Sequence, residues 1–159
     1  MKKPSIILGI DPGIATTGFG IIEVDNQQLK LIKYGCILTK VSLPHGQRLK
    51  QIHQELTALI KKYKPQAVAV EKLFFCNNAK TALVVGEARG VVMLIICQYN
   101  LPVYEYTPLQ VKQAVSAYGK ADKKQVQQMV KLLLNMKEIP KPDDAADALA
   151  VAICCANSI

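Results

Sequence analysis

The chain has 159 residues, half of them hydrophobic and 20% charged, which excludes a disordered polypeptide. This length fits one folded domain, so we expect residues 1–159 to form a single domain with a core of its own. The net charge of +8 favours a polyanionic partner, either nucleic acid or an anionic membrane, although a basic surface can also serve solubility alone.

The cysteines and the apolar runs bear on where the protein works. Uninterrupted apolar runs such as residues 91–97 are far shorter than the ~20 residues of a membrane span. The run near the N-terminus is interrupted at Asp11, unlike a signal peptide. The cysteines are odd in number and form no Cys-x-x-Cys pair, which indicates a reducing compartment. We therefore expect a cytoplasmic protein with no membrane partner.

The first part of the chain is predicted to be a meander of three antiparallel strands. Residues 5–10 are a short apolar run that ends in the turn Asp11-Pro12-Gly13. Further strands are expected over residues 17–24 and 29–39, with a turn at residues 25–26 between them. Consecutive strands joined by short turns favour antiparallel pairing.

Helices and strands alternate in the rest of the chain. Apolar residues at helical spacing predict a helix over residues 48–63, which Pro65 ends. Asp143 is expected to cap the last helix. The elements expected between these two are a strand at 67–70, a helix at 79–99, a strand at 102–106 and helices at 108–118 and 123–134, with the last helix over 143–155. This order predicts an α/β fold with a mixed five-stranded sheet flanked by helices, as in the ribonuclease H-like arrangement.

Four carboxylates are candidates for a shared site. Asp11 and Glu71 each follow a predicted strand, and neighbouring parallel strands would bring these two ends together. Asp144 and Asp147 are three residues apart on the last predicted helix, so they project from nearly the same face. If that helix packs across the edge of the sheet, all four converge.

A cluster of four acids needs a counterion, and oxygen ligands suit Mg²⁺ or Mn²⁺. Two such cations can activate a water and stabilise the leaving oxygen of a phosphodiester. Each acid alone has an ordinary explanation, since Asp11 fits a turn, Asp144 a helix start and Asp147 a solvated helix position. Together these explanations weaken, because Glu71 ends a buried strand and Asp147 stands among small apolar residues.

Five motifs occur in one order along the chain. They are GIDPG at residues 9–13, TGFG at 17–20, AVEKLF at 69–74, GEARGV at 86–91 and DAADALA at 144–150. In sequence and spacing this set closely resembles the RuvC family of bacterial Holliday-junction resolvases, over residues 6–153. The resemblance implies a ribonuclease H-like homodimer and a Mg²⁺-dependent endonuclease that cuts two strands of a four-way junction symmetrically. It also implies roles in recombination and repair, with the RuvA–RuvB branch-migration complex as a partner.

The resemblance assigns roles to single residues. It makes catalytic metal ligands of the four carboxylates, and we expect two metal ions in each site, with Mn²⁺ able to replace Mg²⁺. It gives Lys112 and Lys123 roles in catalysis and DNA binding, where a lysine could steady the scissile phosphate. Lys124 stands beside Lys123 and could be the active lysine instead, and either could be a solvated surface lysine.

Two further positions carry expectations about DNA. Phe74 matches a family aromatic that stacks on a base near the junction, whereas Phe75 is the better candidate for the core. Lys80, at the start of the predicted helix 79–99, is expected on a phosphate. That helix is too apolar to be half solvated, and Gly86 and Gly90 would permit close approach on one face. We expect one face on the sheet and another at a two-fold dimer interface.

Three other interpretations compete with this one. Sugar-kinase and actin-like ATPases share an Asp-x-Gly after the first strand, but they need two such lobes. The smaller YqgF-like relatives share the fold but match the layout from Glu71 to Asp147 less closely. A junction-binding module without catalysis would gain nothing from four carboxylates facing phosphate.

Overall fold

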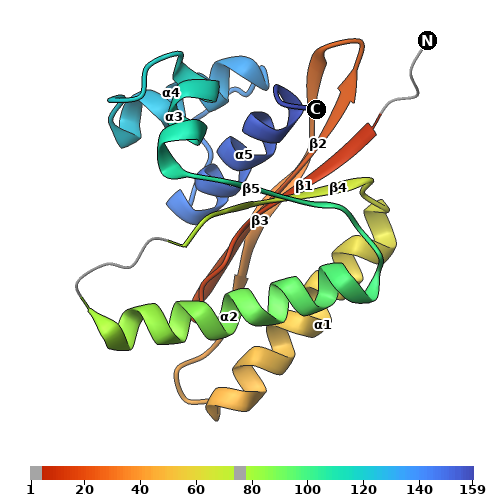
Figure 1. The fold of residues 1–159 in the computed structure, drawn as a ribbon, viewed down its shortest axis with the longest axis vertical. Helices are drawn as coiled ribbons and strands as arrows, with labels where there is room; N and C mark the ends of the chain where they lie inside the picture. Colours follow the sequence, from red (N-terminus) through yellow and green to blue (C-terminus); the bar gives the residue numbers. More distant parts are fainter. Residues whose placement is uncertain (1–4, 74–77) are drawn as a thin grey trace.

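The computed structural model describes residues 5–73 and 78–159, and its elements follow the predicted order (Figure 1). They are β1 (Ser5–Asp11), β2 (Thr16–Asp25), β3 (Gln28–Leu38), α1 (His45–Tyr63), β4 (Ala67–Glu71), α2 (Ala79–Gln98), β5 (Val103–Tyr106), α3 (Pro108–Ser116), α4 (Lys123–Leu133) and α5 (Asp143–Ala156). The predicted mixed five-stranded sheet with flanking helices is confirmed.

The sheet has the strand order β3-β2-β1-β4-β5. The first three strands form the antiparallel meander, and β4 and β5 add to its β1 edge in parallel. Because β1, β4 and β5 run in the same direction, their carboxyl ends meet at one edge. That edge is where functional side chains gather in open α/β sheets.

The helices cover the sheet from two sides. In Figure 1, α3, α4 and α5 lie above the sheet, and α1 and α2 lie below it. Alternating residues of β1 supply both cores, since Ile7 belongs to the α5 side and Leu8 and Ile10 belong to the α1–α2 side. α5 is the most deeply packed helix, with every residue from Ala148 to Cys155 buried.

Two helix starts differ from the prediction. α1 begins at His45 rather than Arg48, because Pro44 takes the cap position and its carbonyl accepts the first helical hydrogen bonds. The prediction that Asp143 caps α5 is wrong. Pro142 occupies that position without a side-chain cap bond, and Asp143 is the first helical residue. Asp143 turns to α4 instead, where Gln127 Nε2 donates to its carboxylate at 3.0 Å.

α2 is long and apolar enough, by length and composition alone, to cross a membrane, which the count of uninterrupted apolar residues did not reveal. In the fold it packs on α1 and the sheet through Ala88, Val92, Ile95 and Ile96. Its other face is exposed, and Leu83 and Leu94 stand out there. The helix is therefore a core element on one side and an unpartnered apolar surface on the other.

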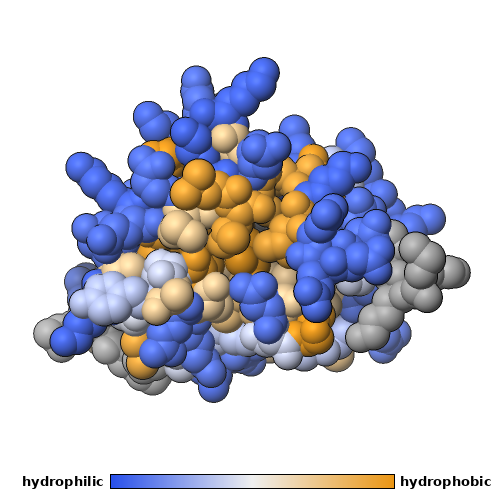
Figure 2. Space-filling model, turned by 90° about the horizontal axis from the view of Figure 1, so that it is seen from above, coloured by the Kyte–Doolittle hydropathy of each residue, from blue (hydrophilic) through white to orange (hydrophobic). Residues whose placement is uncertain are grey.

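A second apolar surface lies at the opposite end of the molecule. Viewed from above, hydrophobic side chains gather in a hollowed centre within a hydrophilic rim (Figure 2). Grooves at this end run between the β2–β3 hairpin and the segment after α4, and their apolar lining includes Leu29, Leu31, Tyr34 and Met136. None of the predicted site residues lines them.

Candidate active site

Asp11 and Glu71 are neighbours because of the register between β1 and β4. The strands are parallel, and Ile10 lies opposite Val70. Each carboxylate is the next and last residue of its strand. Ile10 and Val70 belong to the core on the α1–α2 side, so the alternation of side chains turns both carboxylates toward α5.

The start of α5 lies directly on this edge of the sheet. Gly18 of β2 is opposite Asp11, and the Asp144 carbonyl rests on Gly18 so closely that an added methyl group would overlap it. Gly9 makes the same contact with the carbonyl of Ala148, one turn further along. These two glycines let α5 reach the sheet, and its first turn therefore lies beside Asp11.

The carboxylates share one electrostatic environment. Burial, together with the charges of Asp147, Asp144 and Glu71, raises the pKa of Asp11 to about 7. Burial and Asp147 also raise the pKa of Glu71, and burial raises the pKa of Asp147 although Lys123 opposes it. Asp11 is therefore still partly protonated near neutral pH, and a bound cation would displace its proton.

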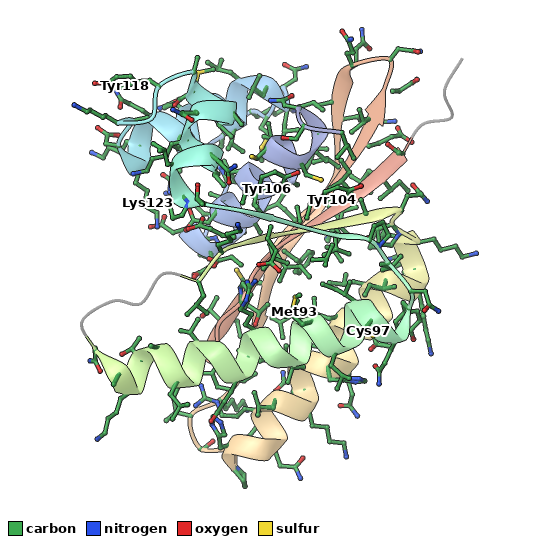
Figure 3. All side chains as sticks on the ribbon, in the orientation of Figure 1. Met93, Cys97, Tyr104, Tyr106, Tyr118 and Lys123 are labelled. Atoms are coloured by element: carbon green, nitrogen blue, oxygen red, sulfur yellow. The ribbon has the colours of Figure 1, made fainter. Side chains whose placement is uncertain are left out.

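Lys123 is the lysine that joins this cluster. Its Nζ lies 3.3 Å from Asp147 and 3.2 Å from Asp143, and Figure 3 shows Lys123 well apart from Tyr118. Burial disfavours its charge, but the carboxylates outweigh burial and raise the pKa of Lys123. Lys124 lies instead in the hollow lined by Tyr118. The geometry therefore favours Lys123 over Lys124 as the lysine at the site.

The other residues that the sequence predicted for the site have fewer contacts with the carboxylates, or lie outside the described residues. Lys112 of α3 is half-buried and near enough to Glu71 that its positive charge partly offsets the rise in the pKa of that carboxyl. Lys80 is exposed at the start of α2 and lines a shallow hollow that includes Asp144. Phe74 and Phe75 lie outside the described residues.

The donor set fits a hard divalent cation. All four candidate ligands are carboxylates, and the raised pKa values of Asp11, Glu71 and Asp147 are those of an acidic cluster short of positive charge. In the ranges 5–73 and 78–159, however, no three His, Cys, Asp or Glu side chains stand close enough to hold a metal ion as they are arranged. The four carboxylates lie along one edge of the sheet but do not surround a common metal position. Lys123 pairs with Asp147 at this edge.

Sequence reasoning missed three neighbours of this site. Asp143 pairs with Lys123, and Cys36 lies opposite Gly18 in β3, where burial and the charge of Asp144 raise the pKa of its thiol. Arg89 reaches from α2 to the backbone of Glu71. The GEARGV motif contains Arg89, but no periodicity indicates which strand its side chain meets.

We expect the metal-free protein to lose stability as the pH rises through about 7. The pKa of Asp11 is raised from 3.8 to about 7, so between these values the folded chain holds a proton that the unfolded chain has released. The free energy of unfolding therefore falls with pH across this window and is lowest above it. Thermal unfolding in EDTA, followed from about pH 4 to about pH 8, measures this fall.

The Asp11→Asn variant isolates the contribution of this residue. It should unfold a few degrees higher than wild type above about pH 7 in EDTA, and the difference should shrink toward pH 4. Parallel pH profiles for the two proteins would contradict the raised pKa of Asp11. Added Mg²⁺ should raise the unfolding temperature of wild type more than that of Asp11→Asn.

The sequence is similar to a known family over most of its length. The family model described as crossover junction endodeoxyribonuclease RuvC matches residues 7–155. A protein of that name from Desulforamulus reducens is 59% identical over 152 residues, which is 96% of this chain and 93% of the relative. Another from Alkaliphilus metalliredigens is 57% identical over 153 residues, with the same shares covered.

The fold of the chain is also similar to that of solved structures. The chain resembles T. thermophilus RuvC in complex with Holliday junction substrate, with a TM-score of 0.90, 36% identity and coverage of 94% of this chain and 92% of that one. The yeast mitochondrial Holliday junction resolvase Ydc2 aligns with a TM-score of 0.69 at 12% identity, over 95% of this chain and 77% of its own. At that identity the second likeness concerns the fold alone.

Proposed function

The chain belongs to the RuvC family of crossover junction endodeoxyribonucleases, and on this premise we propose that the acidic edge of its sheet is where it cuts DNA. The protein is a ribonuclease H-like nuclease that hydrolyses phosphodiester bonds at four-way (Holliday) junctions, in homologous recombination and DNA repair. Family membership does not support the ATPase interpretation or a module that only binds. The observation that supports this site is the convergence of Asp11, Glu71 and the first turn of α5.

The roles at the site follow from its electrostatics. The site would hold two Mg²⁺ ions, or Mn²⁺ in their place, through the carboxylates of Asp11, Glu71, Asp144 and Asp147. The bound metal would supply an activated water and would stabilise the leaving oxygen. Asp11 must lose its proton before it can act as a ligand, and its pKa near 7 places that loss at neutral pH. Lys123 keeps positive charge at the edge beside Asp147.

The surrounding lysines are proposed to bind the junction. Lys80 and Lys112 flank the edge from α2 and α3, with Lys123 and Lys124 on α4, so phosphates would meet positive charge on either side. Phe74, the third residue after the end of β4, is proposed to stack on a base at the junction. Such binding depends on phosphate contacts and should weaken steeply as salt increases.

The exposed face of α2 is proposed to form a homodimer. Leu83 and Leu94 are 67% and 53% exposed, and a Cβ added at Gly86 or Gly90 between them would meet no atom within 4 Å. A two-fold pair across this face would give two active sites for the two strands that must be cut. We also propose a cytoplasmic location and a partnership with the RuvA–RuvB complex.

A charge on this face should break the dimer. Leu94→Glu is expected to give a monomer by light scattering at micromolar concentration, because two carboxylates would have to be buried across the two-fold axis. Its unfolding temperature, measured at a concentration where wild type is monomeric, should change little because Leu94 is exposed in the monomer.

Leu132→Glu on α4 is the matched control, because Leu132 is 66% exposed and lies on another element. It should remain dimeric. If Leu94→Glu stayed dimeric, or if Leu132→Glu became monomeric, the assigned face would be wrong.

The function is tested with a synthetic mobile four-way junction. We expect paired symmetric cuts in Mg²⁺, none on linear duplex, and none with Asp11→Asn protein. Tight binding without cuts, in both Mg²⁺ and Mn²⁺ and with varied junction cores, would indicate an inactive junction binder instead.

A further inference from the structure

Arg89 joins three elements at the acidic edge. Its Nη1 donates to the backbone carbonyl of Glu71 at 2.8 Å, and its Nη2 pairs with the Glu105 carboxylate at 2.6 Å. The guanidinium therefore ties α2 to the last residue of β4 and to β5. Its side chain is only 15% exposed, which makes this a partly buried, charge-assisted contact rather than a surface ion pair.

The carbonyl that Arg89 holds lies where the sheet stops supporting β4. The β1–β4 pairing ends at Val70, one residue before Glu71. On the other side Glu71 lies opposite Tyr106, and Lys72 N donates to the Tyr106 carbonyl at 2.7 Å. Arg89 thus fixes the peptide of Glu71 from the side that β1 has left. The direction of the Glu71 side chain toward Asp11 depends on the orientation of this peptide.

Arg89 also marks the point where α2 meets the sheet. No residue of α2 before Ala88 is buried, whereas Ala88 is completely buried. The earlier half of the helix, including Thr81 and Val85, lines a hollow of about 230 Å³ together with Asp11 and Glu71. The contacts of Arg89 therefore also set how far this half of α2 stands from the carboxylates.

We propose that Arg89, held by Glu105, is a positioning residue for Glu71 that fixes its peptide and the adjacent part of α2 so that the acidic edge can bind metal. This inference rests on the proposed function of that edge. Arg89 is not assigned a contact with DNA, because both of the nitrogens named above are engaged within the protein.

The chemistry requires arginine at this position. A carbonyl and a carboxylate on two different strands are bonded at once by two nitrogens of a rigid planar group. A lysine retains the charge but has one nitrogen on a flexible chain, so it can satisfy one partner well and not both. Arg89→Lys therefore separates the role of geometry from the role of charge.

The test compares Arg89→Lys, Arg89→Gln and Glu105→Gln with wild type. Arg48→Gln is the matched control, since Arg48 is the other arginine of the chain and its Nε also donates to one side chain, Thr39, at 2.8 Å. Three quantities are measured for each protein: Mn²⁺ affinity by calorimetry without DNA, junction affinity in Ca²⁺, and the Mg²⁺ concentration for half-maximal cleavage.

We expect Arg89→Lys and Arg89→Gln to weaken Mn²⁺ binding about 10-fold or more and to raise the half-maximal Mg²⁺ concentration similarly, as loss of a residue that orients a ligand does. Junction affinity should stay within about 2-fold of wild type, because phosphate contacts remain. Glu105→Gln should have a smaller effect in the same direction, and adding it to Arg89→Gln should cost little more. Arg48→Gln should match wild type in all three quantities.

The proposal is overturned if Arg89→Gln binds Mn²⁺ like wild type, if Arg89→Lys is fully active at wild-type Mg²⁺ concentrations, or if only junction affinity falls. If Arg89→Gln fails to fold, Arg89→Lys and Glu105→Gln provide the same comparison. The calorimetry uses no DNA, so a wild-type protein that binds Mn²⁺ but cuts no junction would contradict the proposed function and still allow Arg89 to be judged.

Discussion

Replacing Asp11 with asparagine is expected to reduce junction cleavage by about 1,000-fold or more while junction affinity stays close to that of wild type. Asparagine keeps the size of the side chain but removes the negative charge that a metal ligand needs. Asp11 is the carboxylate whose pKa responds to all three of the others, so its loss affects the whole cluster. Glu71→Gln, Asp144→Asn and Asp147→Asn should act in the same way.

Single-turnover cleavage in Mg²⁺ and binding in Ca²⁺ measure the two effects separately. Asp25→Asn is the matched control, because Asp25 is an exposed carboxylate at the far end of β2 and should be dispensable. Full cleavage by any one of the four variants would remove that residue from the site. Loss of binding together with cleavage would mean that the substitution had disturbed the DNA-binding surface.

Adding a single methyl group at Gly18 should destabilise the protein by about 2–3 kcal/mol, and it should also abolish most cleavage. A Cβ at this position would overlap the carbonyl of Asp144, which is backbone and cannot turn aside as a side chain would. Among the described residues no glycine has a positive φ, so the cost at Gly18 arises from contact rather than from backbone strain. To relieve the contact, α5 would have to lift from β2, and Asp144 and Asp147 would move with it.

Chemical denaturation of Gly18→Ala measures the loss of stability, and the Mg²⁺ requirement for cleavage measures the displacement of α5. Gly46→Ala is the control, because a Cβ at Gly46 meets nothing within 4 Å and the residue lies in α1. That change should stabilise the protein by about 0.5–1 kcal/mol. Equal stability for wild type and Gly18→Ala would show that α5 does not lie as closely on β2 as the structure has it.

The part of the site that lies at strand ends could be predicted from the sequence. Asp11 and Glu71 each follow an apolar run, and the rule that parallel strands end at one edge brings them together without further information. Gly9, Gly18 and Gly20 stand in the same two motifs, but the reason for a glycine at these positions is visible only once α5 is seen to rest on them.

The remainder depends on how helices pack, which periodicity does not specify. Lys123 and Lys124 are equivalent in sequence, and only the placement of α4 against the start of α5 separates them. The same packing gives Asp143 a lysine partner and leaves the cap position to Pro142. Arg89 was visible as part of a motif, but its partners on β4 and β5 follow from the crossing of α2 over the sheet.

The position of α5 in the chain has a consequence for the newly made polypeptide. Asp11 is synthesised well before α5, the helix that carries two of the four candidate carboxylates and covers one face of the sheet. A nascent or truncated chain that stops before Asp143 has half of the acidic cluster and an exposed sheet face. A chain that lacks α5 is therefore expected to be inactive as a nuclease as well as incompletely folded.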